Sequence, residues 1–546
     1  MKAMGARNLL RQALASRVAA TFIVLCLPYL ALGAWLGHAK GMQSVAAYVA
    51  SVGLLLWLFA FVARTWRRFF LLQFPLLLLG VAFAAYTLSF DNLPGQVIAY
   101  VLATSSWEEV RGFFSIWQGQ RLLLAALLLA SIYLILAWRS PPRPIPRSRN
   151  VYLRWGPMVA VVLLSGYAAP NSAALIDGIA TNPIFGTAMF LDGPLRHAEA
   201  AVNGTAMQKL SYGASHIHSE EVHILVIGES ARRDSWSVYG YARKTTPYLE
   251  KLRGEAIFFQ NAVADANLTI CAVPILLTGM SPDRFDLNAI RGNLVDLAAQ
   301  AGYYTAWLMN QDPHVSLLIG IHADRMLYPP AIATLVAGRL PLDETLLPDF
   351  RREIERSGQP RFIGLHVIGS HWQYDTRYPP AFGQFGPTTG LTYLSALSGV
   401  PDQRVVNAYD NSVAYTDWFL SQIIEQARKL AVPATVTYFS DHGEDLFALD
   451  GRAGHGTAGY SKHQFDIPAF VWVNSAYRQL HPDKVLAMTQ NAAKEIRSHN
   501  VFYSVADLMG IEWPGASPAQ SFASTSFIPD LSPQVIAGGA LVSRPD

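Results

Sequence analysis

The stretch Thr437–Phe447, TYFSDHGEDLF, places an aspartate, a histidine and a glutamate directly after an apolar, β-branched run. Asp441, His442 and Glu444 surround a glycine, so a predicted strand delivers two acids and an imidazole to one point. Such a group could supply half of a divalent metal site. Polar turns after strands are common, and the motif taken alone slightly favours a turn.

Other polar side chains lie at the ends of other predicted strands. Glu229 follows the strand Val222–Ile227, where it could simply cap the next helix. His366 lies among apolar neighbours, and a core histidine is the simpler interpretation for it. Taken together, acids and histidines at one rim of a sheet would form a nitrogen and oxygen site without thiolate, which suits zinc. The remaining candidates are His371, which follows His366, and His455 and His463, which precede the last predicted strand. The stretch around His455 would also suit a surface loop.

A candidate nucleophile lies in the stretch Asp265–Gly279, DANLTICAVPILLTG. Thr269 stands where a loop passes into an apolar helix. The free N–H groups and the positive dipole end of a helix N-terminus form a natural cradle for phosphate. For an isolated threonine in this place, a helix N-cap is the simpler interpretation.

The elements that would position these residues begin at about Glu221, where strands start to alternate with helices. This alternation predicts a mainly parallel sheet with helices on both faces. Ligands of such sheets bind beyond the carboxyl ends of the strands, where most candidate residues fall. The predicted strands are Val222–Ile227, Tyr304–Met309, Arg361–Val367, Ala434–Phe439 and Ile467–Val473, and the predicted helices are Gly292–Ala301, Ala408–Leu430 and one that starts over Thr246–Arg253.

The first third of the chain has the composition of a membrane domain. Of all 546 residues 51% are hydrophobic and 15% charged, against roughly 25% charged in an ordinary soluble domain. A membrane span needs about 20 apolar residues, with about 17 as the lower limit. Five stretches meet or approach this length, and the last is the weakest because Arg154 and Pro157 lie near its start. They are Val18–Gly37, Val45–Ala63, Phe69–Phe90, Leu122–Trp138 and Tyr152–Pro170.

The basic residues predict the orientation of these spans. They gather before the first stretch, between the second and third, and between the fourth and fifth, whereas the alternate loops carry chiefly Lys40 and Arg111. By the positive-inside rule the N-terminus is cytoplasmic, and five spans place everything after Pro170 outside the cytoplasm. No cleavage-type motif follows the first stretch, so we interpret it as an anchor and not as a removable signal.

Three regions result: a transmembrane domain over residues 1–170, a connector over 171–220 and an α/β domain over 221–546. The outer loop Asp91–Gln120 contains Glu108, which either belongs to a helix cap or faces a lipid headgroup. The net charge of +3 is too small to indicate a nucleic-acid partner. Cys26 and Cys271 lie in different halves, and we expect no disulfide between them.

These motifs resemble those of the bacterial phosphoethanolamine transferases of the cell envelope, members of the alkaline-phosphatase/sulfatase superfamily. The resemblance covers nearly the whole chain, including the five apolar stretches, and rests on the order and spacing of six motifs. It is greatest to the branch that modifies the core sugars of lipopolysaccharide. The motifs are LVIGESARRDSWSVYGYARKTTPYL, LTICAVPILLTG, AGYYTAWLMNQ, LHVIGSHWQYDTRYP, YDNSVAYTDWFL and YFSDHGEDL.

The resemblance implies an alkaline-phosphatase-like α/β/α sandwich after a five-helix membrane domain, and it assigns roles by position. The residues that match the family's zinc ligands are Glu229, Thr269, Asp441 and His442, and Thr269 also matches its nucleophile. The residues that match catalytic positions binding the phosphoryl group or a second zinc are His371 and His455. The less certain matches are Glu444, His463 and His366 in a second layer, and Glu108 near a carboxylate that faces the lipid donor.

The implied enzyme transfers phosphoethanolamine from phosphatidylethanolamine to lipopolysaccharide, at lipid A or a core sugar, or to a related glycan, through a phosphothreonine intermediate. It is a monomeric, multi-pass protein of the bacterial inner membrane with a periplasmic catalytic domain. Phosphoglycerol transfer and sulfatase-like hydrolysis by the same fold stay open, although a sulfatase would need Cys or Ser in place of Thr269. A non-catalytic membrane sensor also stays open, although no primary metal ligand is missing.

The arginine asymmetry predicts the sidedness of two loops. A reporter fused after Arg149 should behave as cytoplasmic, and a reporter fused after Ser219 should behave as periplasmic. Alkaline phosphatase and fluorescent protein fusions measure this directly. The opposite outcome at either position would remove the predicted topology.

Overall fold

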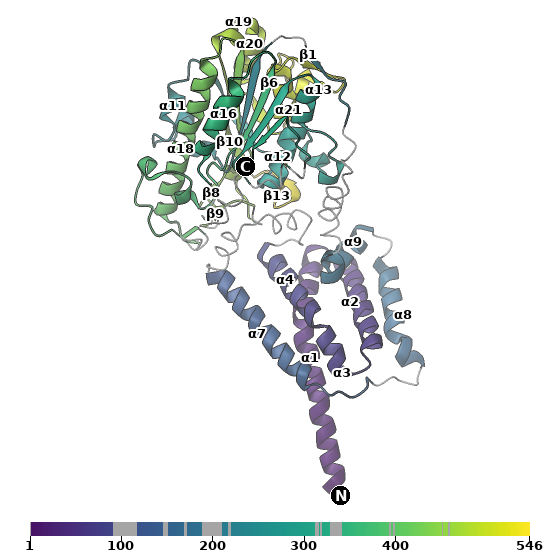
Figure 1. Cartoon of the computed structure of the whole chain (residues 1–546). Coiled ribbons are helices and arrows are strands. Elements are labelled where there is room, and N and C mark those ends of the chain that lie inside the picture. The colour runs from purple at the N-terminus through teal and green to yellow at the C-terminus, as the bar shows by residue number, and fades with distance from the viewer. Residues whose placement is uncertain are drawn as a thin grey trace. The chain divides into compact units, whose positions relative to one another are not determined.

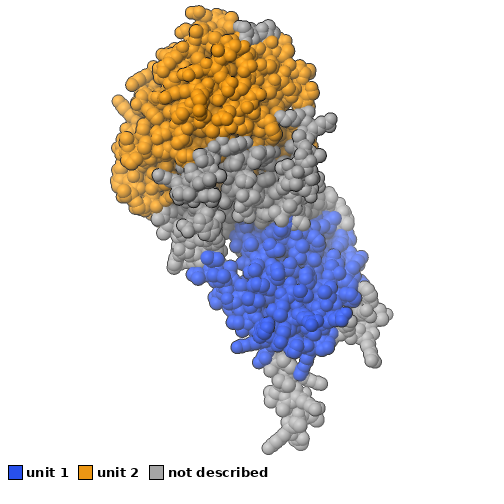
Figure 2. Space-filling view, in the orientation of Figure 1, with its two compact units in different colours: residues 1–99, 117–196 blue, residues 100–116, 197–546 orange. Residues whose placement is uncertain are grey.

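In a computed structural model the chain forms two compact units, which are described separately. One comprises residues 1–99 and 117–196, and the other comprises residues 100–116 and 197–546 (Figure 2). The last change between the units, after residue 196, falls inside the predicted connector, whereas residues 100–116 fall inside the predicted transmembrane domain. The structure describes residues 2–90, 117–145, 151–168, 172–187, 210–216 and 220–545, the last range with gaps at 312–315, 317–318, 328–340, 392–394, 397–398, 450 and 457–458.

The first unit begins with two long apolar helices, α1 (Lys2–Ala39) and α2 (Met42–Ala63). Each is long and apolar enough to cross a membrane, α1 over its part Ser16–Ala39. α3 (Trp66–Leu72) and α4 (Phe74–Phe90) meet at a bend of 42° and could together make a third crossing. Pro75 falls in the first turn of α4, where a helix tolerates a residue without an N–H group, and it cannot continue the hydrogen bonds of α3.

The last two apolar stretches are also helical. They form α7 (Trp117–Arg139) and α8 (Val151–Ala168), and α9 (Ser172–Thr181) follows. Among the described residues, the apolar parts of α7 and α8 are Leu123–Arg139 and Met158–Ala168, and both are shorter than a clear crossing. The described chain therefore has two clear membrane-crossing helices, or three with the bent pair, and five spans stay a prediction.

An eight-stranded mixed sheet forms the centre of the second unit. Its strand order is β11-β3-β10-β7-β2-β6-β4-β5, and all neighbours are parallel except for the two pairs that involve β10. The prediction of a mainly parallel sheet is confirmed. The strands are β2 (Val222–Gly228), β3 (Ala256–Val263), β4 (Tyr304–Met309), β5 (Arg325–Leu327), β6 (Arg361–His366), β7 (Ala434–Ser440), β10 (Asp466–Val473) and β11 (Glu495–Arg497).

Helices cover both faces of this sheet, as predicted for an α/β/α sandwich (Figure 1). α16 and α18 pack against each other and on one face, over β4, β6 and β7, while α12, α13 and α21 form a group on the other. The helices are α11 (Pro247–Glu250), α12 (Thr269–Thr278), α13 (Leu294–Gln300), α16 (Leu347–Ile354), α18 (Gln403–Arg428), α19 (Ser475–Leu480), α20 (Pro482–Asn491) and α21 (Asn500–Leu508).

The five predicted strands are present, with ends that differ by one residue at most. Their continuous apolar runs are those of strands buried on both faces, and every residue of β2 and β7 is buried. β3 was not predicted, because the exposed Gln260 and Asn261 interrupt its apolar run. The helix expected over Thr246–Arg253 is reduced to the single turn α11, since the chain has to turn there into β3.

β10 runs antiparallel to its neighbours β3 and β7. Its beginning, at Asp466, therefore lies at the same edge of the sheet as the ends of the parallel strands β2, β6 and β7. Residues that precede β10 can thus meet residues that follow the parallel strands. Because β10 runs in the opposite direction, candidate residues of one site can follow the parallel strands β2, β6 and β7 and also precede β10.

Three small sheets complete the second unit. One of them, a hairpin of β13 and β14, also forms a bridge from Ile536 to Ala266, in the loop that leads to α12. Cys26 and Cys271 are unpaired, as expected. The small sheets are β1 (Ser215–His216) with β12 (Ile511–Glu512), β8 (Asp445–Leu446) with β9 (Ala453–Gly454), and β13 (Gln534–Ala537) with β14 (Ala540–Ser543).

The central sheet is packed too closely for an added methyl group at Gly364. This glycine in β6 lies against the indole ring of Trp307 in β4, which is fully buried, and a Cβ would overlap ring carbons. Gly364→Ala should therefore destabilise the second unit by about 1–3 kcal/mol, measured as a lower midpoint of thermal unfolding. Gly254→Ala, with nothing within 4 Å of the new Cβ, is the control. Equal midpoints for the two variants would contradict the prediction.

Candidate metal and nucleophile site

Two carboxylates meet at the carboxyl ends of the central strands β2 and β7. Glu229 follows β2 and Asp441 follows β7, so the pairing of the two strands brings these residues together. The Asp441 N–H donates to the carbonyl of Gly228 (3.0 Å), and the Ser230 N–H donates to Asp441 Oδ1 (3.1 Å). Both carboxylates are buried, so their charge has to be balanced locally.

Four side chains from three segments of the chain converge there. His442 Nε2 lies 3.4 Å from Glu229 Oε1 and 3.4 Å from Asp441 Oδ2. Thr269 Oγ1 donates to Glu229 Oε2 (3.1 Å) and lies 3.3 Å from His442 Nε2. The structure thus brings together the four residues that were grouped as metal ligands.

Thr269 is the first residue of α12, and Leu268 occupies the N-cap position. No side chain caps this helix, so the structure does not use Thr269 as an N-cap. Its hydroxyl is instead directed to Glu229 and His442. The threonine therefore combines a place at the positive end of a helix with contact to the acidic cluster.

The donor set fits a metal ion. Asp441 Oδ2 is buried and has no hydrogen-bond partner among the described residues. His442 Nδ1 lies 2.8 Å from the Gly443 carbonyl, so a proton on Nδ1 would leave the Nε2 lone pair directed at the two carboxylates. Glu229, Asp441 and His442 can place their ligand atoms within 4.8 Å of one another. Nitrogen and oxygen donors in this number suit zinc.

The charges of the cluster depend on one another. Burial opposes ionisation of Glu229, but hydrogen bonding to His442 and its charge hold the pKa of Glu229 well below its usual range. Burial, with repulsion from Glu229, raises the pKa of Asp441 to about 8. Burial opposes the imidazolium of His442, yet Asp441 and Glu229 raise its pKa to about 10. Two acids thus compete for one positive charge, and a divalent cation would satisfy both.

A second group adjoins the first. Glu229, His371 and His455 can also bring one ligand atom each within 4.8 Å of one another. His371 Nδ1 lies 2.6 Å from the carbonyl of the next residue, and His455 Nδ1 lies 3.0 Å from Glu444 Oε2. The His455 ring centre lies 4.1 Å from that of His442. Glu444 therefore acts on the site through His455.

Three other predicted residues are not brought into these groups. His366 is buried at the end of β6 without a hydrogen-bond partner among the described residues, and burial lowers its pKa to about 4, as for a neutral core histidine. His463 Nδ1 lies 2.9 Å from Asp234 Oδ2 and 3.3 Å from an Arg232 nitrogen. Glu108 lies outside the described residues.

Two backbone positions shape the turns that carry the carboxylates. Gly443 passes so close to the His463 carbonyl that a Cβ would overlap its oxygen, which explains the glycine in SDHGE. Ser230 has a φ of 54°, in the left-handed region that favours glycine. Its hydroxyl donates to Glu229 Oε1 (2.7 Å), so the strained residue also orients the carboxylate.

Gln311 is a residue of the site that the sequence analysis missed. Its Nε2 donates to Glu229 Oε2 (2.9 Å) and to the Val367 carbonyl (3.2 Å). The available signal was its position two residues after β4, at the edge of the sheet where the other candidates lie. An uncharged amide there is easily taken for a loop residue.

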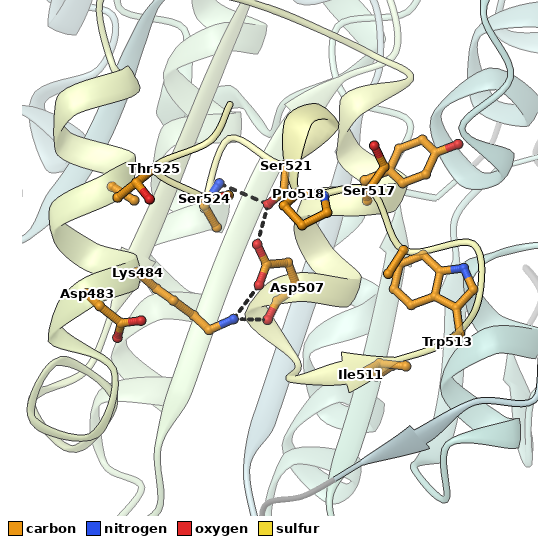
Figure 3. A pocket seen from close by; sticks show the side chains of 14 residues that line it. Asp483, Lys484, Asp507, Ile511, Trp513, Ser517, Pro518, Ser521, Ser524 and Thr525 are labelled. Carbon is orange, nitrogen blue, oxygen red and sulfur yellow. Dashed lines mark hydrogen bonds and ion pairs between the residues drawn. The ribbon is translucent and has the colours of Figure 1, made fainter. Parts of the chain in front are cut away.

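A cavity of about 280 Å³ has none of these residues in its lining (Figure 3). Lys484 pairs in it with Asp507, and the Ser521 hydroxyl donates to Asp507 Oδ2 (2.6 Å). Lys484 and Asp507 therefore balance each other's charge in the cavity, whereas two buried carboxylates share one histidine beside β2 and β7. We assign the chemistry to the centre beside β2 and β7 and not to this cavity.

The chain matches a protein-family model described as Sulfatase over residues 222–511, more than half of its length. It is 26% identical over 314 residues to the phosphoethanolamine transferase EptC of Escherichia coli, and this match covers 56% of the chain and 53% of EptC. The chain thus spans about half the length of the curated relatives it matches.

Proteins of known structure also resemble it, among them two phosphoethanolamine transferases. The C-terminal periplasmic domain of Escherichia coli EptC is 25% identical, with a TM-score of 0.54, over 62% of this chain and 96% of that domain. The same domain has been solved in complex with Zn and matches at 23% identity, with a TM-score of 0.53, over 61% and 95%. The integral membrane protein lipooligosaccharide phosphoethanolamine transferase A (EptA) of Neisseria meningitidis matches at 20% identity, with a TM-score of 0.68, over 93% and 98%. At sequence identities of 20–25%, these structural matches show that the chain shares the fold of these proteins, and they show nothing more.

The donor set predicts that metal binding depends on His442. The full chain should bind zinc tightly, and His442→Ala should lose it, because one of few nitrogen and oxygen ligands is removed. Metal analysis by mass spectrometry after dialysis measures the content. His366→Leu, a buried histidine outside both groups, should keep the metal. A wild-type chain without zinc, or a His442→Ala variant that retains it, would leave only the polar-turn interpretation.

Proposed function

Since this chain belongs to the sulfatase family, we propose that it is a zinc-dependent phosphoethanolamine transferase of a bacterial inner membrane, with its catalytic domain in the periplasm. The proposed donor is phosphatidylethanolamine. The proposed acceptor is lipopolysaccharide, at lipid A or a core sugar. Support comes from the relatives EptC and EptA, which are both named phosphoethanolamine transferases.

The observation that carries the proposal is a hydroxyl held among metal-type ligands at the start of a helix. Thr269 Oγ1 contacts Glu229 and His442, and Thr269 opens α12. Covalent phosphoryl transfer needs an activated nucleophile and a positive environment for the phosphate. The contacts of the Thr269 hydroxyl and its place at the start of α12 support both requirements.

Zinc is the proposed cofactor, held by Glu229, Asp441 and His442 with Thr269 as the fourth ligand. The unpartnered Asp441 Oδ2 and the orientation of His442 support it, as does the zinc complex of the related EptC domain. When bound, zinc supplies positive charge that favours ionisation of a coordinating hydroxyl and stabilises charge on phosphoryl oxygens.

In the first half-reaction Thr269 attacks the donor phosphorus. Its hydroxyl donates to Glu229 Oε2, so the proton has an acceptor as the Thr269–phosphorus bond forms. The phosphorus–oxygen bond to diacylglycerol breaks, and that oxygen takes up a proton. His371 and His455, grouped with Glu229, are proposed to bind the phosphoryl group and to supply this proton.

In the second half-reaction an acceptor hydroxyl attacks the phosphothreonine. A bond from phosphorus to the acceptor oxygen forms, the bond to Thr269 breaks, and Thr269 recovers its proton. The acceptor proton passes to the histidine that protonated diacylglycerol, which restores the starting state. Glu444 holds Nδ1 of His455 and so keeps the other ring nitrogen available for this exchange.

A membrane domain of five spans is proposed to keep the site near its lipid donor. Two helices are long and apolar enough to cross a membrane, and the bent pair would be a third if it forms one span. The five proposed spans also include α7 and α8, and the N-terminus is proposed to lie in the cytoplasm. Glu108, in the outer loop, is proposed to face the lipid headgroup, and the enzyme is proposed to act as a monomer without a nucleic-acid partner.

Phosphoglycerol transfer and sulfate-ester hydrolysis use the same fold and differ in the group that the nucleophile carries. A membrane sensor would carry no group. The mass added to Thr269 therefore separates all of these functions from the proposed one.

The proposal predicts a covalent intermediate on Thr269. Incubation of the full chain with phosphatidylethanolamine, without acceptor, should add one phosphoethanolamine to the peptide that contains Thr269. Peptide mass spectrometry detects the adduct and the residue that carries it.

Variants at Thr269 test the same step. Thr269→Ala should abolish turnover and leave the fold intact, because the N-cap of α12 is Leu268. Thr269→Ser should retain part of the activity, since the hydroxyl remains. Thr278→Ala, at the other end of the same helix, is the matched control, because its hydroxyl donates to the Pro274 carbonyl and accepts the Met280 N–H, and neither residue belongs to the site. An adduct on another residue, or turnover by Thr269→Ala, would refute the assignment.

A further inference from the structure

We infer that a buried pair of amides, Asn267 and Gln464, is a positioning device that sets the nucleophile against the histidines of the site. This inference rests on the proposed function. Both side chains are buried, at 0% and 2% exposure. Asn267 Nδ2 donates to Gln464 Oε1 at 2.7 Å. Neither side chain has an assigned role in the reaction described above.

Gln464 connects the two loops that carry His442 and His455. Its backbone carbonyl accepts the N–H of Gly443 (2.8 Å), the residue that follows His442. Its side-chain Nε2 donates to the carbonyl of Gly454 (3.1 Å), the residue that precedes His455. One residue is thus bonded directly next to both histidines.

Asn267 extends this connection to the nucleophile. It lies two residues before Thr269, and its side chain contributes the bond to Gln464. Its Oδ1 accepts the N–H of Gly538, and its N–H donates to the carbonyl of Ile536 (3.1 Å). The loop before α12 is therefore fixed from two sides, by Gln464 and by the hairpin β13–β14.

The partners determine which way both amides face. The Gly454 carbonyl can only accept a hydrogen bond, so the Gln464 nitrogen must face it. The Gly538 N–H can only donate, so the Asn267 oxygen must face it. The Asn267 nitrogen is then left to donate to the Gln464 oxygen. Reversing either amide would break its hydrogen bond to the backbone and would place two donors or two acceptors against each other.

A buried ion cluster holds the hairpin against the same loop. Arg497 Nε donates to Asp265 Oδ1 (2.7 Å), and His499 Nδ1 lies 2.9 Å from Asp265 Oδ2. The N–H of Ile536 donates to the carbonyl of Asp265 (2.8 Å). All three side chains are buried, so their hydrogen bonds are shielded from water where the hairpin meets the loop before Thr269.

Three catalytic segments thus meet on one amide pair, although Thr269 and His442 belong to distant parts of the chain. Their relative placement decides whether the hydroxyl faces phosphorus with the histidines in reach, and a misplacement of about 1 Å can cost on the order of 100-fold in rate. The pair acts through other residues and touches no reacting atom. It should therefore affect kcat more than KM.

Gln464→Met tests this role, because methionine keeps the length of the side chain and removes both of its hydrogen bonds. We expect kcat for phosphoethanolamine transfer to fall by about 10- to 100-fold, with little change in KM for the lipid donor. Asn491→Ala is the matched control. Asn491 is an equally buried amide that donates to two backbone carbonyls, of Phe522 and Ser524, and its loss should lower the thermal midpoint without lowering kcat. An unchanged kcat in Gln464→Met, or an equal loss in both variants, would overturn the inference.

A double-mutant comparison tests whether the amides act as one unit. The variant that combines Asn267→Ala and Gln464→Met should lose less in kcat than the product of the two single losses, because both single changes break the same bond between the amides. Factors that multiply would show two independent effects and would overturn the inference.

Hydrogen exchange supplies a readout that does not need turnover. Peptides over residues 264–270 and 441–456 should exchange faster in Gln464→Met than in the wild-type chain. Absence of a Thr269 adduct in the wild-type chain would refute the proposed function alone. Unchanged exchange in these peptides would refute the amide connection alone.

Discussion

The charge balance of two buried carboxylates is the constraint on which the rest of the structure depends. Glu229 and Asp441 lie side by side at the end of the central strands, where unpaired charge is costly. His442 offers one positive charge to two acids. The pKa of Glu229 is therefore lowered and that of Asp441 is raised, because only one of the two negative charges is balanced. The proposed zinc ion therefore belongs to the electrostatics of the folded domain as much as to its chemistry.

The parts of the site differ in how firmly the fold holds them. The two carboxylates stand on strands paired in the middle of an eight-stranded sheet, which is the most rigid support that the domain offers. The proposed nucleophile stands on α12, which packs on α13 and α21, and the histidines of the second group stand on loops. A metal site needs fixed ligands, whereas groups that bind a passing substrate benefit from some freedom.

Much of this could be predicted from the sequence, because buried parallel strands are continuous apolar runs and their ends are marked by polar residues. Asp441, His442 and Glu229 stand out for that reason. β3 escaped prediction because two exposed amides interrupt its pattern. Gln311, Asn267 and Gln464 escaped because amides show no signal in one sequence, and their roles arise from partners far away along the chain. His366 has the residue type of a ligand, but only the structure shows it without a partner in the core.

The attachment of the hairpin β13–β14 to the loop before Thr269 bears on when the domain becomes competent during synthesis. A chain that emerges with its N-terminus first exposes Glu229 and Thr269 long before Gly538. Until the hairpin docks, the Asn267 N–H and the Asp265 carbonyl lack their backbone partners, so the loop before Thr269 gains these hydrogen bonds only after residue 536 has been synthesised. Fragments that end before the hairpin therefore lack the backbone hydrogen bonds that join residues 536 and 538 to the loop before Thr269.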